Sequence, residues 1–174
     1  MEDQESYPMT PQVSWFTCRT QRLAAIGIAL VIFGLVFRSH YKLTIVSGSS
    51  MFPTLKSGDV LLVDKRAYEQ SEPDRGDIVV ARYAAGLVVK RVVGLPGEQV
   101  ELKKGRLYIN GNLMKEEHPI DPGYLDVGEG KLLAGDFATV GDNRAVAPAL
   151  AIHPIITKSD ILGKVVMALG KQIR

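Results

Sequence analysis

At residues 47–55 the chain reads Ser-Gly-Ser-Ser-Met-Phe-Pro-Thr-Leu, directly after the apolar run Leu43–Val46. Gly48 lets the backbone turn and lets another segment come close. Pro53 fixes its own φ angle and pushes the residue before it towards an extended conformation. A serine held between such constraints can present its hydroxyl in one direction, as a nucleophile must. An ordinary turn between two strands would have the same kind of sequence, so a second feature is needed to distinguish a nucleophile from a turn.

The second feature is a strand-like run at residues 87–93, Leu-Val-Val-Lys-Arg-Val-Val. Side chains alternate along a strand, so Lys90 and Arg91 point to opposite faces and either could turn inward. Arginine cannot act as a base, because its pKa lies above about 12. Lys90 can, if burial between valines lowers the pKa of its amine. The alternative is a lysine that extends from an edge strand into solvent.

The composition is that of one folded domain, with 174 residues of which 46% are apolar and 23% charged. The formal net charge of +2 and the scattered basic residues give no basis for a nucleic-acid partner. The single cysteine, Cys18, excludes an intrachain disulfide and a cysteine metal site. The histidines His40, His118 and His153 lie far apart in the sequence, which argues against a zinc site. We therefore expect neither a metal nor a cofactor.

The N-terminal part predicts a membrane anchor. Residues 1–22 form a tail that begins with a polar stretch, and Leu23–Phe37 is a run of fifteen residues without a charge. As a helix this run spans about 22 Å, short of the roughly 30 Å hydrocarbon core, but flanking arginines can reach the interface. A buried core helix would show a polar face, and a cleaved signal peptide would have a short basic leader and a small-x-small site. Neither pattern is present, so we expect an uncleaved single-pass anchor, which its flanking charges do not orient.

From Leu43 onward the sequence changes to short apolar runs separated by turn residues, which is typical of a mainly β domain over residues 43–174. Asn110-Gly111 between two such runs is the strongest short hairpin signal. The stretch Glu116–Gly130 is irregular and acidic, and we expect an exposed loop there. The strand-like runs are Leu43–Val46, Val60–Val63, Ile78–Tyr83, Leu87–Val93, Val100–Leu102, Leu107–Ile109, Leu113–Met114, Phe137–Val140 and Ile161–Leu169.

Five motifs, taken together, closely resemble the bacterial type I signal peptidases, which are membrane-anchored serine proteases with a Ser/Lys dyad. The resemblance runs from about Tyr41 to Val166, with the motifs in the family's order. It implies a mainly β fold of coiled antiparallel sheets, with Ser50 as the nucleophile and Lys90 as the general base. The motifs are Ser50-Met51-x-Pro53-Thr54-Leu55, Gly58-Asp59, Arg75-Gly76-Asp77-Ile78-Val79, Lys90-Arg91-Val92-Val93-Gly94-Leu95-Pro96-Gly97-Glu98 and Gly141-Asp142-Asn143-Arg144.

The same resemblance implies how the site is built and what it acts on. The backbone N–H of Ser50 is the expected oxyanion donor, because the position that carries a serine hydroxyl in many relatives is Gly48 here. The implied substrates are secreted preproteins, cut after small residues at the first and third positions before the bond. The implied setting is a monomer in the lipid of the cell membrane, with its catalytic domain on the extracytoplasmic side. Residues expected to support the site are Gly48, Met51, Pro53, Arg91, Gly141, Asp142, Asn143 and Arg144.

The chain departs from the family after Arg144. Relatives continue with a serine, an aspartate and an arginine where this sequence has Ala147, Ala149 and Ala151. In the family the serine hydrogen-bonds the lysine, and the acid and the arginine form an ion pair that braces the site. Losing one neutral hydrogen bond costs about 0.5–1.5 kcal/mol, or roughly two- to tenfold in rate, which predicts a slower enzyme and not a dead one.

Two hypotheses from different classes follow. The first is an active endopeptidase with a simplified site, and the second is a catalytically weak or inactive paralogue that binds preproteins at the membrane. The presence of both Ser50 and Lys90 favours the first. A Ser-His-Asp hydrolase is disfavoured because residues 48–52 lack the second glycine of a nucleophile elbow. A self-cleaving repressor of the SOS type is disfavoured because an apolar anchor stands in place of a DNA-binding helix-turn-helix.

Overall fold

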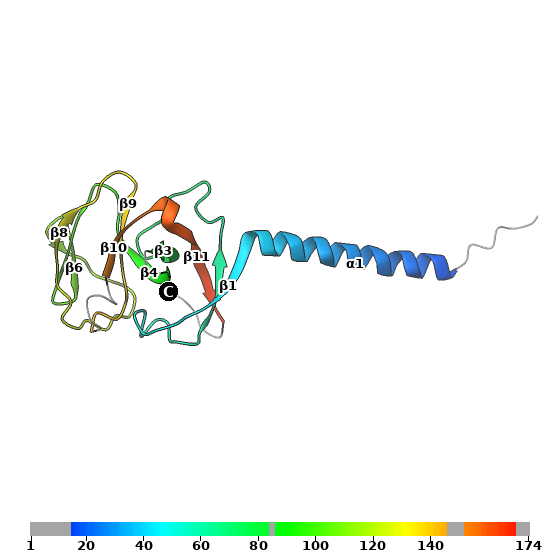
Figure 1. Cartoon of the computed structure of the whole chain (residues 1–174), viewed down its shortest axis with the longest axis horizontal. Helices are drawn as coiled ribbons and strands as arrows, with labels where there is room; N and C mark the ends of the chain where they lie inside the picture. The colour runs from blue at the N-terminus through cyan, green and yellow to red at the C-terminus, as the bar shows by residue number, and fades with distance from the viewer. Residues whose placement is uncertain (1–14, 84–85, 146–151, 170–174) are drawn as a thin grey trace, which may run out of the picture. The chain divides into compact units, whose positions relative to one another are not determined.

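The computed structural model describes residues 15–83, 86–145 and 152–169. The chain divides into two compact units, with the boundary between Arg38 and Ser39. The first unit contains most of helix α1, Trp15–His40, which ends just past the boundary. The strands all belong to the second unit (Figure 1).

Helix α1 has 26 residues and is longer than the uncharged run Leu23–Phe37 at both ends. The flanking residues contain no proline or glycine, so nothing in them stops the helix. Its segment Thr20–His40 has 21 residues and a mean hydropathy of 1.9, and the side chains from Thr20 to Arg38 are exposed. At about 1.5 Å per residue this segment is about 31 Å long, which matches a hydrocarbon core of roughly 30 Å. By length and composition, α1 can cross a membrane.

The described residues of the second unit form two sheets, and every pairing between these strands is antiparallel, which confirms the predicted mainly β fold. Strands β6 and β8 of the small sheet lie beside β9 and β10 of the large one (Figure 1). Among the described residues, the large sheet has the order β1 (Tyr41–Ile45), β2 (Val60–Asp64), β11 (Ile161–Ala168), β3 (Ile78–Tyr83), β4 (Gly86–Gly94), β9 (Asp136–Val140) and β10 (Ile152–Thr157). The small sheet has the order β7 (Asn112–Leu113), β6 (Arg106–Ile109), β5 (Gln99–Lys103) and β8 (Val127–Lys131). A 3₁₀ turn, η1 (Lys158–Asp160), joins β10 to β11.

Each run predicted from the sequence forms a strand, with ends that differ from the prediction by no more than two residues. The predicted hairpin is also present, because Asn110 and Gly111 connect β6 to β7. Both residues have positive φ angles, 50° and 77°, as a tight hairpin turn requires.

The structure adds two strands that the sequence analysis did not predict. Strand β8 contains two glycines and forms one edge of the small sheet. Strand β10 contains Pro154, shows an irregular register between Ile152 and Ile155, and forms one edge of the large sheet. Edge strands tolerate proline and glycine and need no alternating apolar pattern, which explains why both were missed. Strand β8 also corrects the prediction that Glu116–Gly130 is a loop throughout.

Strand β4 lies in the middle of the large sheet, between β3 and β9. Its Val92 belongs to one buried cluster, and its Val93 belongs to another cluster that also contains residues of the small sheet. Both faces of the strand are therefore covered at this point. The sequence left open whether Lys90 or Arg91 turns inward, and the structure buries both, because β4 is not an edge strand.

Candidate active site

The segment that carries Ser50 follows β1 and is anchored by buried side chains. Met51 and Leu55 belong to the core cluster of the large sheet, and the N–H of Leu55 donates to the carbonyl oxygen of Met51 at 2.8 Å. Gly48 has a φ of 95°, a conformation that glycine adopts without steric cost. Pro53, joined to the preceding residue by a cis peptide bond, is half-buried. Ser50 itself is partly exposed.

Lys90, on β4, is only 2% exposed. Burial lowers the pKa of its amine to about 8, although the charge of Asp142 acts in the opposite direction. At pH 7 about a tenth of amines with this pKa are uncharged, against about one in three thousand for an ordinary lysine. Lys90 is therefore able to accept a proton under neutral conditions.

Gly141 brings the backbone of Ser50 and the amine of Lys90 together. A methyl group on its Cα would lie 2.2 Å from the carbonyl oxygen of Ser50 and 3.4 Å from Nζ of Lys90. Those two atoms are therefore no further apart than the sum of these two distances. Asn143 holds the same backbone, because its N–H donates to the carbonyl oxygen of Ser50 at 3.0 Å and its side-chain amide donates to that of Ser49 at 3.1 Å.

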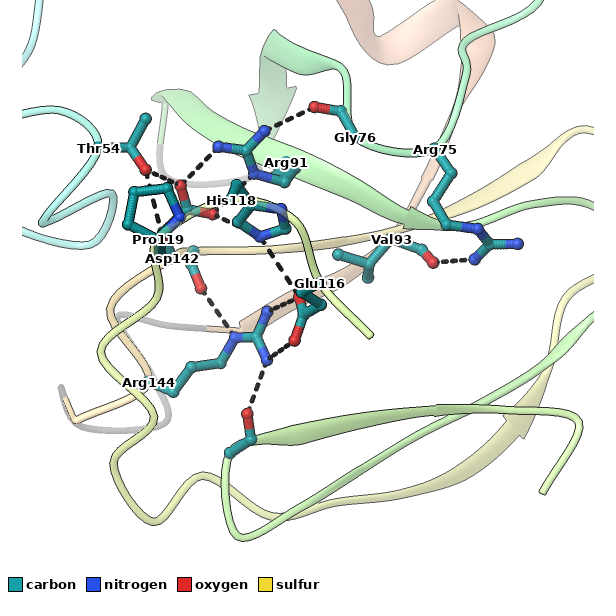
Figure 2. A network of polar contacts seen from close by, with 12 residues as sticks. Thr54, Arg75, Gly76, Arg91, Val93, Glu116, His118, Pro119, Asp142 and Arg144 are labelled. Carbon is teal, nitrogen blue, oxygen red and sulfur yellow. Dashed lines mark hydrogen bonds and ion pairs between the residues drawn. The ribbon is translucent and has the colours of Figure 1, made fainter. Parts of the chain in front are cut away.

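A buried ion pair joins β4 to this loop (Figure 2). Arg91 donates from Nε to Oδ1 of Asp142 at 2.9 Å and from Nη2 to Oδ2 at 2.7 Å, and the two side chains are 2% and 0% exposed. Nη1 of Arg91 donates to the carbonyl oxygen of Gly76 at 2.7 Å. The hydroxyl of Thr54 donates to Oδ2 of Asp142 at 2.5 Å, so the segment that carries Ser50 is tied to the same carboxylate. Such forked, charged hydrogen bonds are both strong and directional.

Glu116 and His118 also belong to this network, and the sequence analysis did not identify them. The carboxylate of Glu116 accepts hydrogen bonds from the buried Arg144, and Nε2 of His118 lies 3.4 Å from Glu116 and 3.6 Å from Asp142. Both come from the irregular stretch that was expected to be exposed, where no periodicity or motif indicates a role. Thr54, in contrast, stands inside the first motif and could have been named from the sequence.

The described residues supply a partly exposed serine whose backbone lies next to a buried amine with a lowered pKa. This combination is suited to nucleophilic attack with transfer of a proton. Within the described part of the chain, no group of three or more His, Cys, Asp or Glu side chains is arranged to hold a metal ion. Ala147, Ala149 and Ala151 lie outside the described residues, as do residues 1–14 of the N-terminal tail.

Comparison with known proteins gives consistent matches. The family described as signal peptidase, peptidase S26, matches residues 19–169. A signal peptidase I of Leptolyngbya laminosa is 32% identical over 153 residues, which cover 82% of this chain and 73% of that protein. A signal peptidase I of Bacillus amyloliquefaciens is 37% identical over 134 residues, which cover 70% of this chain and 67% of that protein.

Two further matches differ in coverage. A probable signal peptidase I-2 of Synechocystis is 30% identical over 142 residues, and the chain spans 63% of its length. Among solved structures, a signal peptidase I from Enterococcus faecalis is 23% identical with a TM-score of 0.45, and the match covers 55% of this chain and 98% of that one.

The first prediction concerns the close contact at Gly141. The substitution Gly141→Ala places a methyl group 2.2 Å from the backbone oxygen of Ser50, which is too close, so the backbone has to move. Because a displacement of about 1 Å in reacting groups costs roughly 10²-fold in rate, we expect kcat/KM for peptide cleavage to fall by about that factor. The matched control is Gly128→Ala, whose new methyl group meets nothing within 4 Å. Wild-type kcat/KM in Gly141→Ala would contradict this view of the site.

The second prediction concerns the substitution Arg91→Lys. Lysine has no planar guanidinium, so it cannot form the fork to Asp142 and also reach the carbonyl oxygen of Gly76. Losing a hydrogen bond to a charged group costs about 1.5–3 kcal/mol, and we expect the free energy of unfolding in urea to fall by about that amount. Arg106→Lys, at an exposed position of β6, is the control. Equal stability of the two variants would contradict the importance of the fork.

Proposed function

The chain belongs to the signal peptidase family, peptidase S26, and we propose that it is a serine endopeptidase that removes signal peptides from secreted preproteins. In this proposal Ser50 is the nucleophile and Lys90 is the general base. The observation that carries the proposal is the state of Lys90, which is buried, has a pKa lowered to about 8, and packs with the backbone of Ser50 against Gly141. The relatives that bear the name signal peptidase I support the substrate class.

The reaction begins with Lys90 uncharged. Its amine takes the proton of the Ser50 hydroxyl as the oxygen attacks the carbonyl carbon of the scissile peptide. The backbone N–H of Ser50 donates to the oxyanion that forms, and Gly48 adds no side-chain donor. The C–N bond then breaks, Lys90 returns the proton to the leaving amine, and an acyl group remains on Ser50. Water hydrolyses this ester with Lys90, again uncharged, as the base.

The proposed setting is the cell membrane, where α1 is a single-pass anchor for a monomer whose peptidase unit lies on the extracytoplasmic side. The length and composition of α1 support the anchor, and the family resemblance supports the side and the monomer. Exposed apolar side chains on β1 and β11, which both pair with β2, offer a surface for contact with lipid. They are Leu43, Ile45, Val166 and Met167.

A second candidate function is that of a catalytically weak or inactive paralogue that binds preproteins at the membrane. The observation that favours it is the absence of the usual hydroxyl, acid and arginine at Ala147, Ala149 and Ala151. The burial of Lys90 favours the active endopeptidase, because burying an amine costs free energy and a surface that only binds preproteins does not require it. The assays below separate the two functions.

The third prediction is a pH profile. Since only the uncharged amine of Lys90 can act as a base, kcat/KM should rise with pH and level off above about pH 8. At pH 6 an amine with this pKa is about 1% uncharged, so the rate there should be about a hundredfold below the plateau. Cleavage of a preprotein by the detergent-solubilised chain between pH 6 and pH 10 measures this. A profile without an acidic limb would exclude Lys90 as the base.

A substitution completes this test. Lys90→Arg should remove activity as fully as Ser50→Ala, because arginine keeps the charge and cannot release a proton near neutral pH. Lys103→Arg, at an exposed position of β5, is the matched control and should cleave at the wild-type rate. Wild-type turnover by Lys90→Arg would overturn the assignment, and inactivity of the wild-type protein would favour the paralogue.

A further inference from the structure

A second buried ion pair lies close to the first (Figure 2). The fully buried guanidinium of Arg144 donates to the two carboxylate oxygens of Glu116 at 2.5 and 3.0 Å, and Glu116 is only 7% exposed. The same guanidinium donates from Nη1 to the carbonyl oxygen of Gly105 at 2.7 Å and from Nε to that of Gly141 at 3.2 Å. The carboxylate of Glu116 therefore fixes the plane of the group that holds the Gly141 carbonyl.

Glu116 reaches Arg144 from a distant part of the sequence, and the segment after Arg144 offers no substitute. Residues 145–151 are alanine, valine, proline and leucine only, so they cannot supply a counter-ion. The neighbouring Asp142 is engaged by Arg91 and Thr54. Loss of Glu116 would leave a guanidinium buried without a carboxylate partner among the described residues, an arrangement that folded proteins avoid.

The segment that carries Glu116 is held along the loop of residues 141–144. The N–H of Asp121 donates to the carbonyl oxygen of Asp142 at 2.9 Å, and the N–H of Arg144 donates to the carbonyl oxygen of Asp121 at 2.7 Å. His118 belongs to the same segment, and its Nε2 lies 3.4 Å from the carboxylate of Glu116 and 3.6 Å from that of Asp142. The segment therefore moves with the loop on which the proposed reaction depends.

We propose that Glu116 is a positioning residue for the reaction of Ser50 and Lys90, and that it acts through Arg144 on Gly141. This inference rests on the proposed function. Gly141 is the residue against which both the backbone of Ser50 and the amine of Lys90 pack. A shift of its backbone therefore changes how the amine is aimed at the hydroxyl.

Glu116 also belongs to a group of four buried charges that includes Asp142, the carboxylate whose charge acts on Lys90. Burial alone would raise the pKa of Glu116, but the hydrogen-bonded guanidinium of Arg144 and the nearby ring of His118 hold it below its ordinary value, so the carboxylate is charged at neutral pH. Its charge and that of Asp142 balance the two buried arginines. Without the Glu116 charge this group is net positive, and we expect that charge to disfavour the protonated form of Lys90.

The test compares Glu116→Gln with Glu117→Gln, a matched control at an exposed neighbouring position. In Glu116→Gln we expect kcat on the pH plateau to fall by at least about tenfold, KM to change by less than about twofold, and the acidic limb to move below about pH 8. Glu116→Asp keeps the charge at a greater distance from Arg144. The acidic limb of its pH profile should therefore stay at the wild-type position, and its kcat should recover in part. Glu117→Gln should match the wild-type protein in all three quantities.

A second readout separates this inference from the proposed function. Competitive acetylation with acetic anhydride, followed by mass spectrometry, measures the pH at which Lys90 loses its proton whether or not the protein cleaves anything. We expect this midpoint to be lower in Glu116→Gln than in the wild type, Glu116→Asp and Glu117→Gln.

The outcomes distinguish the two claims. An unchanged midpoint with unchanged kcat in folded Glu116→Gln overturns the positioning role and leaves the proposed function standing. A wild-type protein that cleaves no preprotein overturns the proposed function. The acetylation midpoint of Lys90 in Glu116→Gln then tests the coupling of Glu116 to Lys90 without any activity measurement. If Glu116→Gln does not fold, the test uses Glu116→Asp instead. A kcat of Glu116→Asp equal to that of Glu117→Gln would then overturn the inference.

Discussion

The ion pair between Arg91 and Asp142 is the contact on which the rest of the site depends. Each partner follows directly on a residue of the proposed site, because Lys90 precedes Arg91 and Gly141 precedes Asp142. Pairing the two charges therefore aligns β4 with the loop that holds the backbone of Ser50. A hydroxyl and a backbone carbonyl complete the hydrogen bonds of the pair, which a buried pair requires. Removing one partner of such a pair typically costs about 3–5 kcal/mol.

The same carboxylate acts on the chemistry of Lys90. Burial in β4 disfavours the charged amine, while the nearby charge of Asp142 favours it, and the result is a pKa of about 8. Burial without the carboxylate would lower the pKa further and give a weaker base. An exposed lysine would be charged at neutral pH and could accept no proton. A value close to the working pH is the condition under which a general base is most effective. Position and proton affinity of Lys90 therefore have one structural origin.

The sequence predicted the features that depend on local pattern, and it missed those that depend on distant partners. The hairpin at Asn110-Gly111 follows from two residues that tolerate positive φ, and the central strands follow from their apolar runs. The burial of both Lys90 and Arg91 depends on strands that flank β4, which alternation along one strand cannot reveal. Glu116 resembles any acidic residue in an acidic loop until Arg144, 28 positions away, is placed against it.

The central claim is that Ser50 attacks the peptide bond, and one comparison tests it most directly. The detergent-solubilised chain is incubated with a secreted preprotein, and mass spectrometry identifies the products for the wild type, Ser50→Ala and Ser49→Ala. Ser49 is the matched control, because its described contact with Asn143 is made by its backbone carbonyl. The account predicts a mature product cut after a small residue for the wild type and Ser49→Ala, and none for Ser50→Ala. The same product from Ser50→Ala at the wild-type rate would contradict the account.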